Sequence, residues 1–281
     1  MKQKMIVFDI GGSSSRIALF EGQDIVWRDQ VVTPSQAGPE AMVTCMLELY
    51  APVASQTGTI GVAITGHIVN GTVTAHNSAI LPGWKQFPLQ AELSRRMQRP
   101  VRIFNDARAA AWGEYVYGTG QGCDDFLFLT VSTGVGAGLV LQRRLHIASN
   151  GFDAEIGEMR LADGNTLEQL ASGTALGEFA RLHGYTDARD FCAAADQGVA
   201  IPADIYQQGI SALAAKLADL AVMLGVQRVA VGGSVGLRPG YLQHLRNEIQ
   251  RYPAIYQLEL LPAALRHDAG LIGVADLIRK T

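Results

Sequence analysis

Residues 5–13 read Met-Ile-Val-Phe-Asp-Ile-Gly-Gly-Ser, an apolar run of strand-forming residues that two glycines end. A second extended run, Arg16–Phe20, follows it, and a third covers Asp24–Val32. Apolar runs separated by short glycine-containing connections are typical of antiparallel strands. The sequence therefore predicts a three-stranded antiparallel meander at the start of the chain.

The same pattern returns after one domain length. Residues 126–134 read Phe-Leu-Phe-Leu-Thr-Val-Ser-Thr-Gly, and Thr130 corresponds to Asp9, an offset of 130 − 9 = 121 residues. In this copy we expect a glycine-rich turn from Ser132 to Gly138, after which Leu139–Leu141 resumes an extended run. A repeat at this interval indicates two related α/β lobes that face a shared cleft.

Other segments extend this α/β pattern. Helical spacing or strand-like runs predict further elements at Pro39–Ala51, Thr59–Ile64, Val101–Phe104, Asn105 to about Tyr115, Asp204–Leu224, Gln227–Val231 and Asp268–Lys280. We predict an N-terminal lobe over residues 1–116, completed by the C-terminal helix at 268–281, and a larger lobe over residues 117–267.

Composition excludes several classes of protein. Of the 281 residues, 48% are hydrophobic and 17% charged, which excludes a disordered chain. The net charge of −3 argues against binding to nucleic acid or anionic membranes through bulk charge. Cys45, Cys123 and Cys192 form no C-x-x-C pair, so the sequence indicates neither a disulfide framework nor a cysteine zinc site. With no signal peptide or membrane-length apolar run, we expect a cytoplasmic protein.

Both glycine turns suit a nucleotide. Glycine leaves backbone N–H groups unobstructed, and such groups bind phosphate oxygens. Asp9 would repel bare phosphate and fits better near Mg²⁺ or its waters, whereas Ser132 and Thr133 add hydroxyl donors. Either turn alone reads equally well as a tight hairpin, but the pair favours nucleotide binding. The chain has no G-x-x-x-x-G-K-[ST] loop, and its glycine run leads into an extended segment, unlike a Rossmann fingerprint.

Asn105-Asp106 follows a predicted strand and precedes a predicted helix. One interpretation is a helix N-cap, a position that prefers both residue types. The other is a general base, because phosphoryl transfer to an alcohol needs a carboxylate that accepts the hydroxyl proton.

Three further acidic residues, Glu155, Glu158 and Glu168, stand among apolar neighbours and suit the hydroxyls of a sugar, although acidic residues on a solvated helix surface are commonplace. Gly232-Gly233 follows a strand and reads equally well as a plain turn or as a ligand contact.

Together these motifs resemble the ROK family of sugar kinases and repressors, which has the actin-like ATPase (ribonuclease H-like) fold. Residues 9–13 and 130–138 are similar to its two phosphate motifs, 105–106 to its base motif and 232–236 to its adenosine-contacting turn. The resemblance spans nearly the whole chain, with the motifs in the family's order.

The resemblance implies roles for individual residues. Asp106 would take the proton from the sugar 6-hydroxyl, with Asn105 holding neighbouring hydroxyls, Gly66 letting backbone approach the sugar, and Glu155 and Glu168 binding the far side of the ring. The residues implied for ATP and Mg²⁺ are Asp9, Gly11, Gly12, Ser13, Ser132, Thr133, Gly134, Val135, Gly136, Ala137, Gly138, Gly232 and Gly233.

The chain also departs from the family pattern. Many members carry a histidine where this chain has Glu158, followed by a cysteine-rich zinc loop, whereas here residues 162–166 contain no cysteine. Between His146 and His183 there is no His or Cys, so tetrahedral zinc coordination by nitrogen and sulfur is not available locally. We expect a zinc-free protein in which Glu158 either contacts the sugar or is a solvated side chain.

The substrate is inferred from local similarity. Residues 231–237, 240–242 and 266–271 are similar to the members that phosphorylate N-acetylmannosamine in sialic acid breakdown, and family members are usually homodimers. Glucose-specific members carry an Asn shortly before a Trp, where this chain has Ile80 before Trp84. The alternatives are a kinase for another hexose or N-acylhexosamine, such as glucose or N-acetylglucosamine, or a non-catalytic sugar sensor. Repressors of the family carry an amino-terminal helix-turn-helix, for which we expect no room because the first strand starts by Met5.

Overall fold

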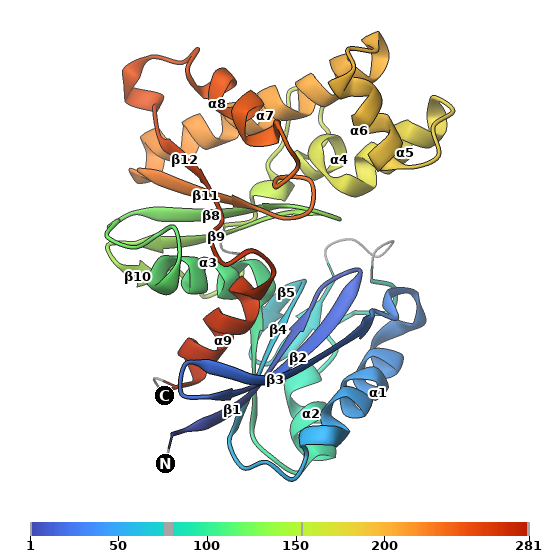
Figure 1. The fold of residues 1–281 in the computed structure, drawn as a ribbon, viewed down its shortest axis with the longest axis vertical. Helices are drawn as coiled ribbons and strands as arrows, with labels where there is room; N and C mark the ends of the chain where they lie inside the picture. The colour runs from blue at the N-terminus through green and yellow to red at the C-terminus, as the bar shows by residue number, and fades with distance from the viewer. Residues whose placement is uncertain (1, 76–80, 153, 280–281) are drawn as a thin grey trace. The chain divides into compact units, whose positions relative to one another are not determined.

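The structure is a computed structural model that describes residues 2–75, 81–152 and 154–279 (Figure 1). The chain forms two compact units. Unit 1 comprises residues 1–113, 147–153 and 267–281, and unit 2 comprises residues 114–146 and 154–266. Ile80, which bears on the choice between glucose and N-acetylmannosamine, lies outside the described residues.

Strands make up the centre of each unit. Their bounds are β1 Lys4–Ile10, β2 Ser14–Glu21, β3 Asp24–Val32, β4 Thr59–Ile64, β5 His67–Val69, β6 Thr72–Thr74, β7 Val101–Asn105, β8 Phe126–Val131, β9 Val135–Leu141, β10 Arg144–Leu145, β11 Arg228–Gly232 and β12 Glu259–Pro262.

Helices surround these strands. The α-helices are α1 Gly38–Tyr50, α2 Leu89–Met97, α3 Asp106–Tyr117, α4 Glu168–Ala171, α5 Gly173–Leu182, α6 Ala188–Asp196, α7 Ala200–Leu224, α8 Tyr241–Ile249 and α9 Ala269–Arg279. The short 3-10 helices are η1 Ser35–Ala37, η2 Ala51–Val53, η3 Ile156–Glu158, η4 Ala254–Tyr256 and η5 Arg266–Asp268. Among the described residues, no helix combines the length and the apolar character that crossing a membrane requires.

Unit 1 is built on a sheet with the strand order β3-β2-β1-β4-β7. Its first three strands are antiparallel, which confirms the predicted meander, and β4 runs parallel to both β1 and β7. Alternate side chains of β1 point to opposite faces. Ile6 and Phe8 pack with α1 and α2, which lie together in Figure 1, whereas Met5 and Val7 pack with α3 and α9. Both faces of the central strand are therefore buried, as expected where helices cover a sheet on both sides.

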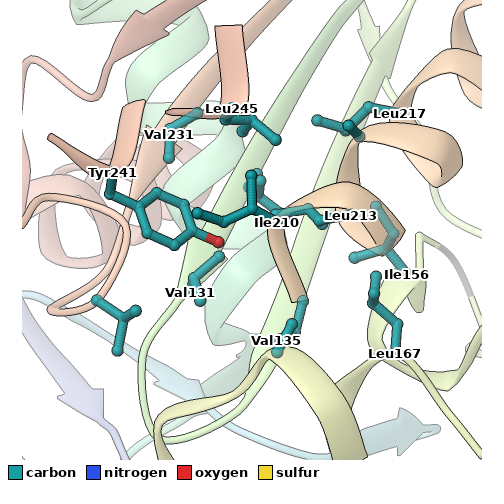
Figure 2. Packing of buried hydrophobic residues seen from close by; sticks show 14 of the residues in the cluster. Val131, Val135, Ile156, Leu167, Ile210, Leu213, Leu217, Val231, Tyr241 and Leu245 are labelled. Carbon is teal, nitrogen blue, oxygen red and sulfur yellow. The ribbon is translucent and has the colours of Figure 1, made fainter. Parts of the chain in front are cut away.

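Unit 2 repeats this arrangement with the strand order β10-β9-β8-β11-β12. Again the first three strands are antiparallel and the last two run parallel to β8. Figure 2 shows the core on one face of this sheet, where Ile210 and Leu213 of α7 pack near Val131 and Val231. The predicted duplication of one strand–turn–strand unit is thus confirmed by the strand order of both sheets.

The second glycine turn is shorter than the sequence predicts. The prediction of a turn through Gly138 is wrong, because β9 begins at Val135 and the connection consists of Ser132, Thr133 and Gly134. Gly136 pairs with Thr130 and Gly138 pairs with Phe128, so the ladder with β8 continues through both glycines. Glycine weakens a strand but does not prevent it from pairing. Whether Val135, Gly136, Ala137 and Gly138 contact ATP stays a prediction.

A buried carboxylate lies where the chain passes between the units. Glu114, on α3, is 0% exposed and is the first residue of unit 2. Its oxygens accept hydrogen bonds from the backbone N–H groups of Thr119 (3.0 Å), Ala264 (3.1 Å) and Leu265 (2.7 Å). The chain returns to unit 1 directly after Arg266. Within unit 2, Glu114 therefore connects the segment where the chain enters the unit, near Thr119, to the segment just before the chain leaves it, at Ala264 and Leu265.

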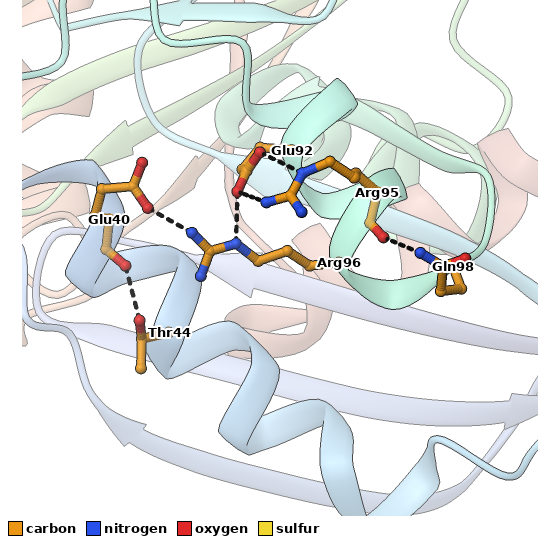
Figure 3. Close-up of polar contacts among 6 residues, drawn as sticks. All are labelled: Glu40, Thr44, Glu92, Arg95, Arg96 and Gln98. Atoms are coloured by element: carbon orange, nitrogen blue, oxygen red, sulfur yellow. Dashed lines mark hydrogen bonds and ion pairs between the residues drawn. The ribbon is translucent and has the colours of Figure 1, made fainter.

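Charged side chains join α1 to α2 on the surface of unit 1 (Figure 3). Glu92 accepts hydrogen bonds from Arg95 (2.6 Å) and Arg96 (2.5 Å), and Arg96 also contacts Glu40 at 2.8 Å. Hydrogen bonds from the two guanidinium groups lower the pKa of Glu92 to about 2.

Candidate active site

In unit 1 the candidate residues gather at one edge of the sheet. Ile64 pairs with Ile10 on one side and with Asn105 on the other, so the parallel strands β1, β4 and β7 end together. The carboxyl edge of parallel strands is where α/β proteins place their ligands. Near this edge of unit 1 lie Asp9, the first turn Gly11–Ser13, Gly66, Asn105 and Asp106.

Asn105 connects two of these candidates. Its Oδ1 accepts a hydrogen bond from the backbone N–H of Arg108 (2.9 Å), which confirms the N-cap interpretation for this residue. Its Nδ2 donates to the carbonyl oxygen of Gly66 (3.2 Å). Asp106 is the first residue of α3 and accepts from the N–H of Ala107 (2.9 Å). The structure thus brings Gly66, Asn105 and Asp106 together, and the cap fixes the orientation of the Asn105 side chain.

Asp9 is a largely buried carboxylate in β1. Burial, with a smaller contribution from the negative charge of Asp268, raises its pKa to about 6 against the opposing effect of the Arg16 guanidinium. Arg16 Nη1 lies 3.5 Å from Asp9 Oδ2 and donates a shorter hydrogen bond to the carbonyl oxygen of His267 (2.7 Å). The partial pairing with Arg16 leaves Asp9 with charge that a cation would stabilise. A hard oxygen donor of this kind fits Mg²⁺.

The first turn is held by the strands of the meander. The N–H of Gly11 donates to the carbonyl oxygen of Ser14 (3.0 Å). Thr33, directly after β3, donates from its hydroxyl to the Gly11 carbonyl (2.8 Å) and from its N–H to the Ser13 carbonyl (3.1 Å). Three strands therefore fix the conformation of this turn.

The second turn, Ser132–Gly134, is held by a helix instead. The Ser132 carbonyl accepts from the N–H of Gly173 (2.7 Å), at the start of α5. The Thr133 carbonyl accepts from both the N–H (3.1 Å) and the hydroxyl (2.8 Å) of Thr174. The first residues of α5 thus orient the turn through its carbonyl groups.

The segments that carry the three acidic candidates of unit 2, Glu155, Glu158 and Glu168, lie at the start of β9. Glu168 Oε2 accepts from the N–H of Val135 (2.9 Å), and a Cβ added to Gly134 would lie only 2.5 Å from that oxygen. A Cβ on Gly157, between Glu155 and Glu158, would lie 2.2 Å from the Val135 carbonyl oxygen.

These close approaches show that both acidic segments pack on the same strand end. Glu155 is half-buried and Glu158 is exposed. Their contact with a sugar stays a prediction.

Gly233 allows the predicted adenosine turn, residues 232–236, to pack closely against the end of β8, next to the second turn. Its φ is +84°, and a Cβ would lie 2.3 Å from the carbonyl oxygen of Val131. A residue other than glycine is therefore strained and blocked at this position. The same Val131 oxygen accepts from the N–H groups of Val235 (2.9 Å) and Gly236 (3.0 Å). The hydroxyl oxygens of Ser132 and Ser234 lie 3.2 Å apart, so the two predicted nucleotide motifs of unit 2 are in contact.

Within the part of the chain that the structure describes, no three His, Cys, Asp or Glu side chains are grouped as metal ligands. The absence of zinc stays a prediction. Each unit gathers its own candidates, namely Asp9 to Asp106 in unit 1 and Ser132 to Gly233 in unit 2.

Sequence reasoning missed the hairpin of β5 and β6, which begins at His67, directly after Gly66. Its turn, Asn70-Gly71, has φ values of 50° and 77° and was a readable signal, because Asn-Gly between strand-forming residues favours a two-residue hairpin turn. The segment Ile147–Phe152, which packs on this hairpin, carries no comparable local signal.

Comparison with known proteins identifies relatives over the full length. The ROK family model matches residues 5–281. The N-acetylmannosamine kinase of Haemophilus influenzae is 34% identical over 287 residues, which cover 98% of this chain and 95% of that protein. The bifunctional enzyme NanE/NanK of Brucella melitensis is 34% identical over 277 residues, which cover 97% of this chain and 53% of that protein. The chain therefore spans about half the length of the bifunctional relative.

Solved structures confirm the predicted fold class. A ROK family glucokinase from Streptomyces griseus, in complex with glucose and AMPPNP, superposes with a TM-score of 0.84 at 27% identity and covers 99% of this chain and 100% of that chain. A ROK hexokinase from Thermus thermophilus has a TM-score of 0.81, also at 27% identity, with the same coverage. The fold is the α/β fold of the actin-like ATPases. With a family match over nearly its whole length, the chain belongs to the ROK family.

Proposed function

We propose that the protein is an ATP-dependent kinase that converts N-acetylmannosamine to N-acetylmannosamine 6-phosphate. The observation that carries the proposal is the group of Gly66, Asn105 and Asp106 at the carboxyl edge of the unit 1 sheet. The full-length relatives named N-acetylmannosamine kinase support the choice of sugar. Support for ATP comes from the ROK glucokinase solved with AMPPNP.

Asp106 acts as the general base in this proposal. As the sugar 6-oxygen forms its bond to the γ-phosphorus, the bond from that phosphorus to the β–γ bridging oxygen breaks and ADP leaves. The hydroxyl proton passes to the Asp106 carboxylate. Asn105 orients the sugar through neighbouring hydroxyls, because its hydrogen bonds to Arg108 and Gly66 restrict its side chain to one direction.

The two turns bind the nucleotide. We assign the phosphates to Gly11–Ser13 and Ser132–Gly134 and the adenosine to Gly232-Gly233, all of which have their backbone fixed by the contacts described above. Asp9 would hold Mg²⁺, which neutralises phosphate charge when bound.

Acidic residues of unit 2 also bind the sugar in this proposal. Glu155 and Glu168 accept hydrogen bonds from its hydroxyls. The N–H of Val135 fixes one oxygen of Glu168 and so presents the carboxylate in a defined orientation. Exposed Glu158 takes the place of the family histidine and, when ionised, only accepts hydrogen bonds.

The test is an ADP-release assay with Mg²⁺-ATP and a panel of N-acetylmannosamine, N-acetylglucosamine, mannose and glucose. We expect kcat/KM to be highest for N-acetylmannosamine, with a 6-phosphate product identified by mass spectrometry. Glucose is the second candidate, since two similar solved structures are named glucokinase and hexokinase. A higher kcat/KM for glucose would overturn the choice of sugar, and no phosphorylation of any sugar would overturn the kinase.

We also propose that the enzyme works without zinc. Elemental analysis of the purified protein should find zinc far below one equivalent, and removal of trace zinc by a chelator should leave activity with Mg²⁺ unchanged. A stoichiometric zinc content would contradict this proposal.

A further inference from the structure

The segment Ile147–Phe152, here called the strap, belongs to unit 1 although the chain on both sides of it belongs to unit 2. It packs on the hairpin of β5 and β6. His67, the first residue of that hairpin, makes two of the contacts. Its Nε2 donates to the carbonyl oxygen of Asn150 (2.6 Å), and its ring stacks on Phe152 with centroids 4.0 Å apart and an angle of 16° between the planes.

Gly151 allows this close packing. Its φ is +77°, and a Cβ would lie 2.7 Å from His67 Nε2 and 2.8 Å from the carbonyl oxygen of Ile68. The strap also holds its own shape, because the N–H of Gly151 donates to the Ala148 carbonyl (2.9 Å) and the N–H of Phe152 donates to Asn150 Oδ1 (3.1 Å). The strap is therefore a tight turn fitted to His67.

Chain connectivity links the strap to two predicted sugar contacts. His67 directly follows Gly66, whose carbonyl oxygen accepts the hydrogen bond from Asn105. Phe152 precedes Glu155 by three residues, and three Cα steps span at most about 11 Å. Fixing Phe152 against unit 1 therefore limits how far Glu155 can move from the hairpin.

We propose that His67 is a positioning residue for the sugar. It holds the strap on the hairpin, and the three chain steps from Phe152 to Glu155 then restrict how far the Glu155 backbone can move from the strap. This inference rests on the proposed sugar kinase activity and on the predicted role of Glu155. His67 itself need not touch the sugar.

The variants His67→Ala and Phe152→Ala test the contact. His67→Ala loses the stacking contact and the hydrogen bond to Asn150 and should raise KM for the sugar about tenfold. Phe152→Ala loses only the stacking contact and should raise it less, and neither variant should change KM for ATP more than about twofold. Because both side chains act through one contact, the double variant should be no worse than the more affected single variant. His67→Gln keeps an N–H donor and should recover part of the loss.

His183→Ala is the matched control, because His183 is an exposed histidine whose ring lies 6.4 Å from that of Phe191 in unit 2. It should leave both KM values unchanged. Hydrogen exchange of a peptide spanning residues 147–152 should become faster in His67→Ala and stay unchanged in His183→Ala. A strap that exchanges equally in wild type and His67→Ala would overturn the proposed contact without any reference to activity.

The variant Glu155→Gln tests whether the effect of His67 on sugar binding depends on the Glu155 carboxylate. If His67 acts through Glu155, adding His67→Ala to Glu155→Gln should change kcat/KM for the sugar less than about twofold. A full additional tenfold loss would overturn the positioning role. An active wild type with an unchanged sugar KM in His67→Ala would also overturn it, while the proposed kinase would stand.

If the wild type phosphorylates no sugar, the proposed function fails. Sugar binding measured by calorimetry then replaces KM, and His67→Ala must weaken it about tenfold for the positioning role to survive. A wild type that binds none of the sugars in the panel would overturn that role as well.

Discussion

The two glycine turns stand on the same strand arrangement but carry different chemistry. In unit 1 the turn begins two residues after Asp9, which pairs with Arg16 on the neighbouring strand. In unit 2 the corresponding residue is Thr130, which pairs with Gly136. The charged pair Asp9 and Arg16 of unit 1 thus corresponds to the uncharged pair Thr130 and Gly136 of unit 2. The two units thus share one strand order, while the charged pair at this position of the strand is found in unit 1 and not at the corresponding position of unit 2.

The hydrogen bonds that hold the two turns also come from different elements. Thr33 of the meander holds the first turn, whereas α5 holds the second through Gly173 and Thr174. We infer that both turns bind phosphate oxygens and that the strand before the unit 1 turn adds a cation site at Asp9, which Thr130 does not supply in unit 2. The predictions below test this division.

The largest effect is expected at Asp106, because the comparison assigns proton transfer to the charged edge of unit 1. Asp106→Asn should lower kcat by a factor of about 10² to 10⁴ with little change in ATP affinity, since only the proton acceptor is lost. Rapid-mixing kinetics and nucleotide titration measure the two quantities. A near-normal kcat would remove Asp106 from the role of base.

Asp9→Asn tests the charge difference between the copies. The pKa of Asp9 is raised from 3.8 to about 6, so the folded protein binds this proton more tightly than the unfolded chain does. Wild-type stability should therefore fall as pH rises from about 4 to about 6. Above that range Asp9→Asn should increase the free energy of unfolding by at most about 3 kcal/mol, while Mg²⁺-dependent turnover drops.

Denaturant unfolding from pH 4 to 8 measures this effect. Thr130→Val at the equivalent position of unit 2 is the control, and any change that it causes should not depend on pH over this range. An Asp9→Asn protein that is less stable than wild type at pH 7.5 would contradict the prediction.

Gly134→Ala and Gly11→Ala compare the space around the two turns. At Gly134 the new Cβ would displace Glu168 from its bond to Val135, with an expected cost of about 1–2 kcal/mol and a higher KM for the sugar. At Gly11 the nearest atom to a Cβ is the Ser14 carbonyl oxygen, 3.5 Å away, which is an ordinary contact. Melting temperatures should fall for the first variant only, and equal decreases would contradict the comparison.

The smallest effect concerns charge away from both turns. Glu92→Gln removes the acceptor of the network in Figure 3. Because the pKa of Glu92 is lowered from 4.5 to about 2, its contribution is present above pH 4.5 and is lost as pH falls through 2. A small decrease in melting temperature at pH 7 should shrink in high salt, since exposed ion pairs are screened. A salt-independent decrease would point to lost packing instead.

Local patterns predicted most of the sheet. The bounds of β3 and β4 agree with the apolar runs Asp24–Val32 and Thr59–Ile64, because apolar strands bounded by turn residues carry a strong local signal. The candidate residues at the carboxyl edge of the unit 1 sheet were predictable in part, because the polar pair Asn105-Asp106 stands where β7 ends and α3 begins.

Long-range contacts limited the rest. The second turn was predicted too long because pairing with β8 decides where β9 begins. Contacts of the strap with His67 join residues about 80 positions apart, which no local pattern reveals. The raised pKa of Asp9 depends on burial and on Asp268, from the far end of the chain.

The discontinuous composition of both units has a consequence for biosynthesis. Glu114 gains two of its three backbone donors only from Ala264 and Leu265, and the sheet face bearing Met5 and Val7 is covered by Leu271 and Val274 of α9. A ribosome-bound chain that lacks these residues has an unsatisfied buried carboxylate in one unit and exposed strand side chains in the other. Unit 2 can therefore complete its packing only after Ala264 and Leu265 have emerged, and unit 1 only after α9 has emerged, so we expect nascent chains to depend on chaperones until these segments are available.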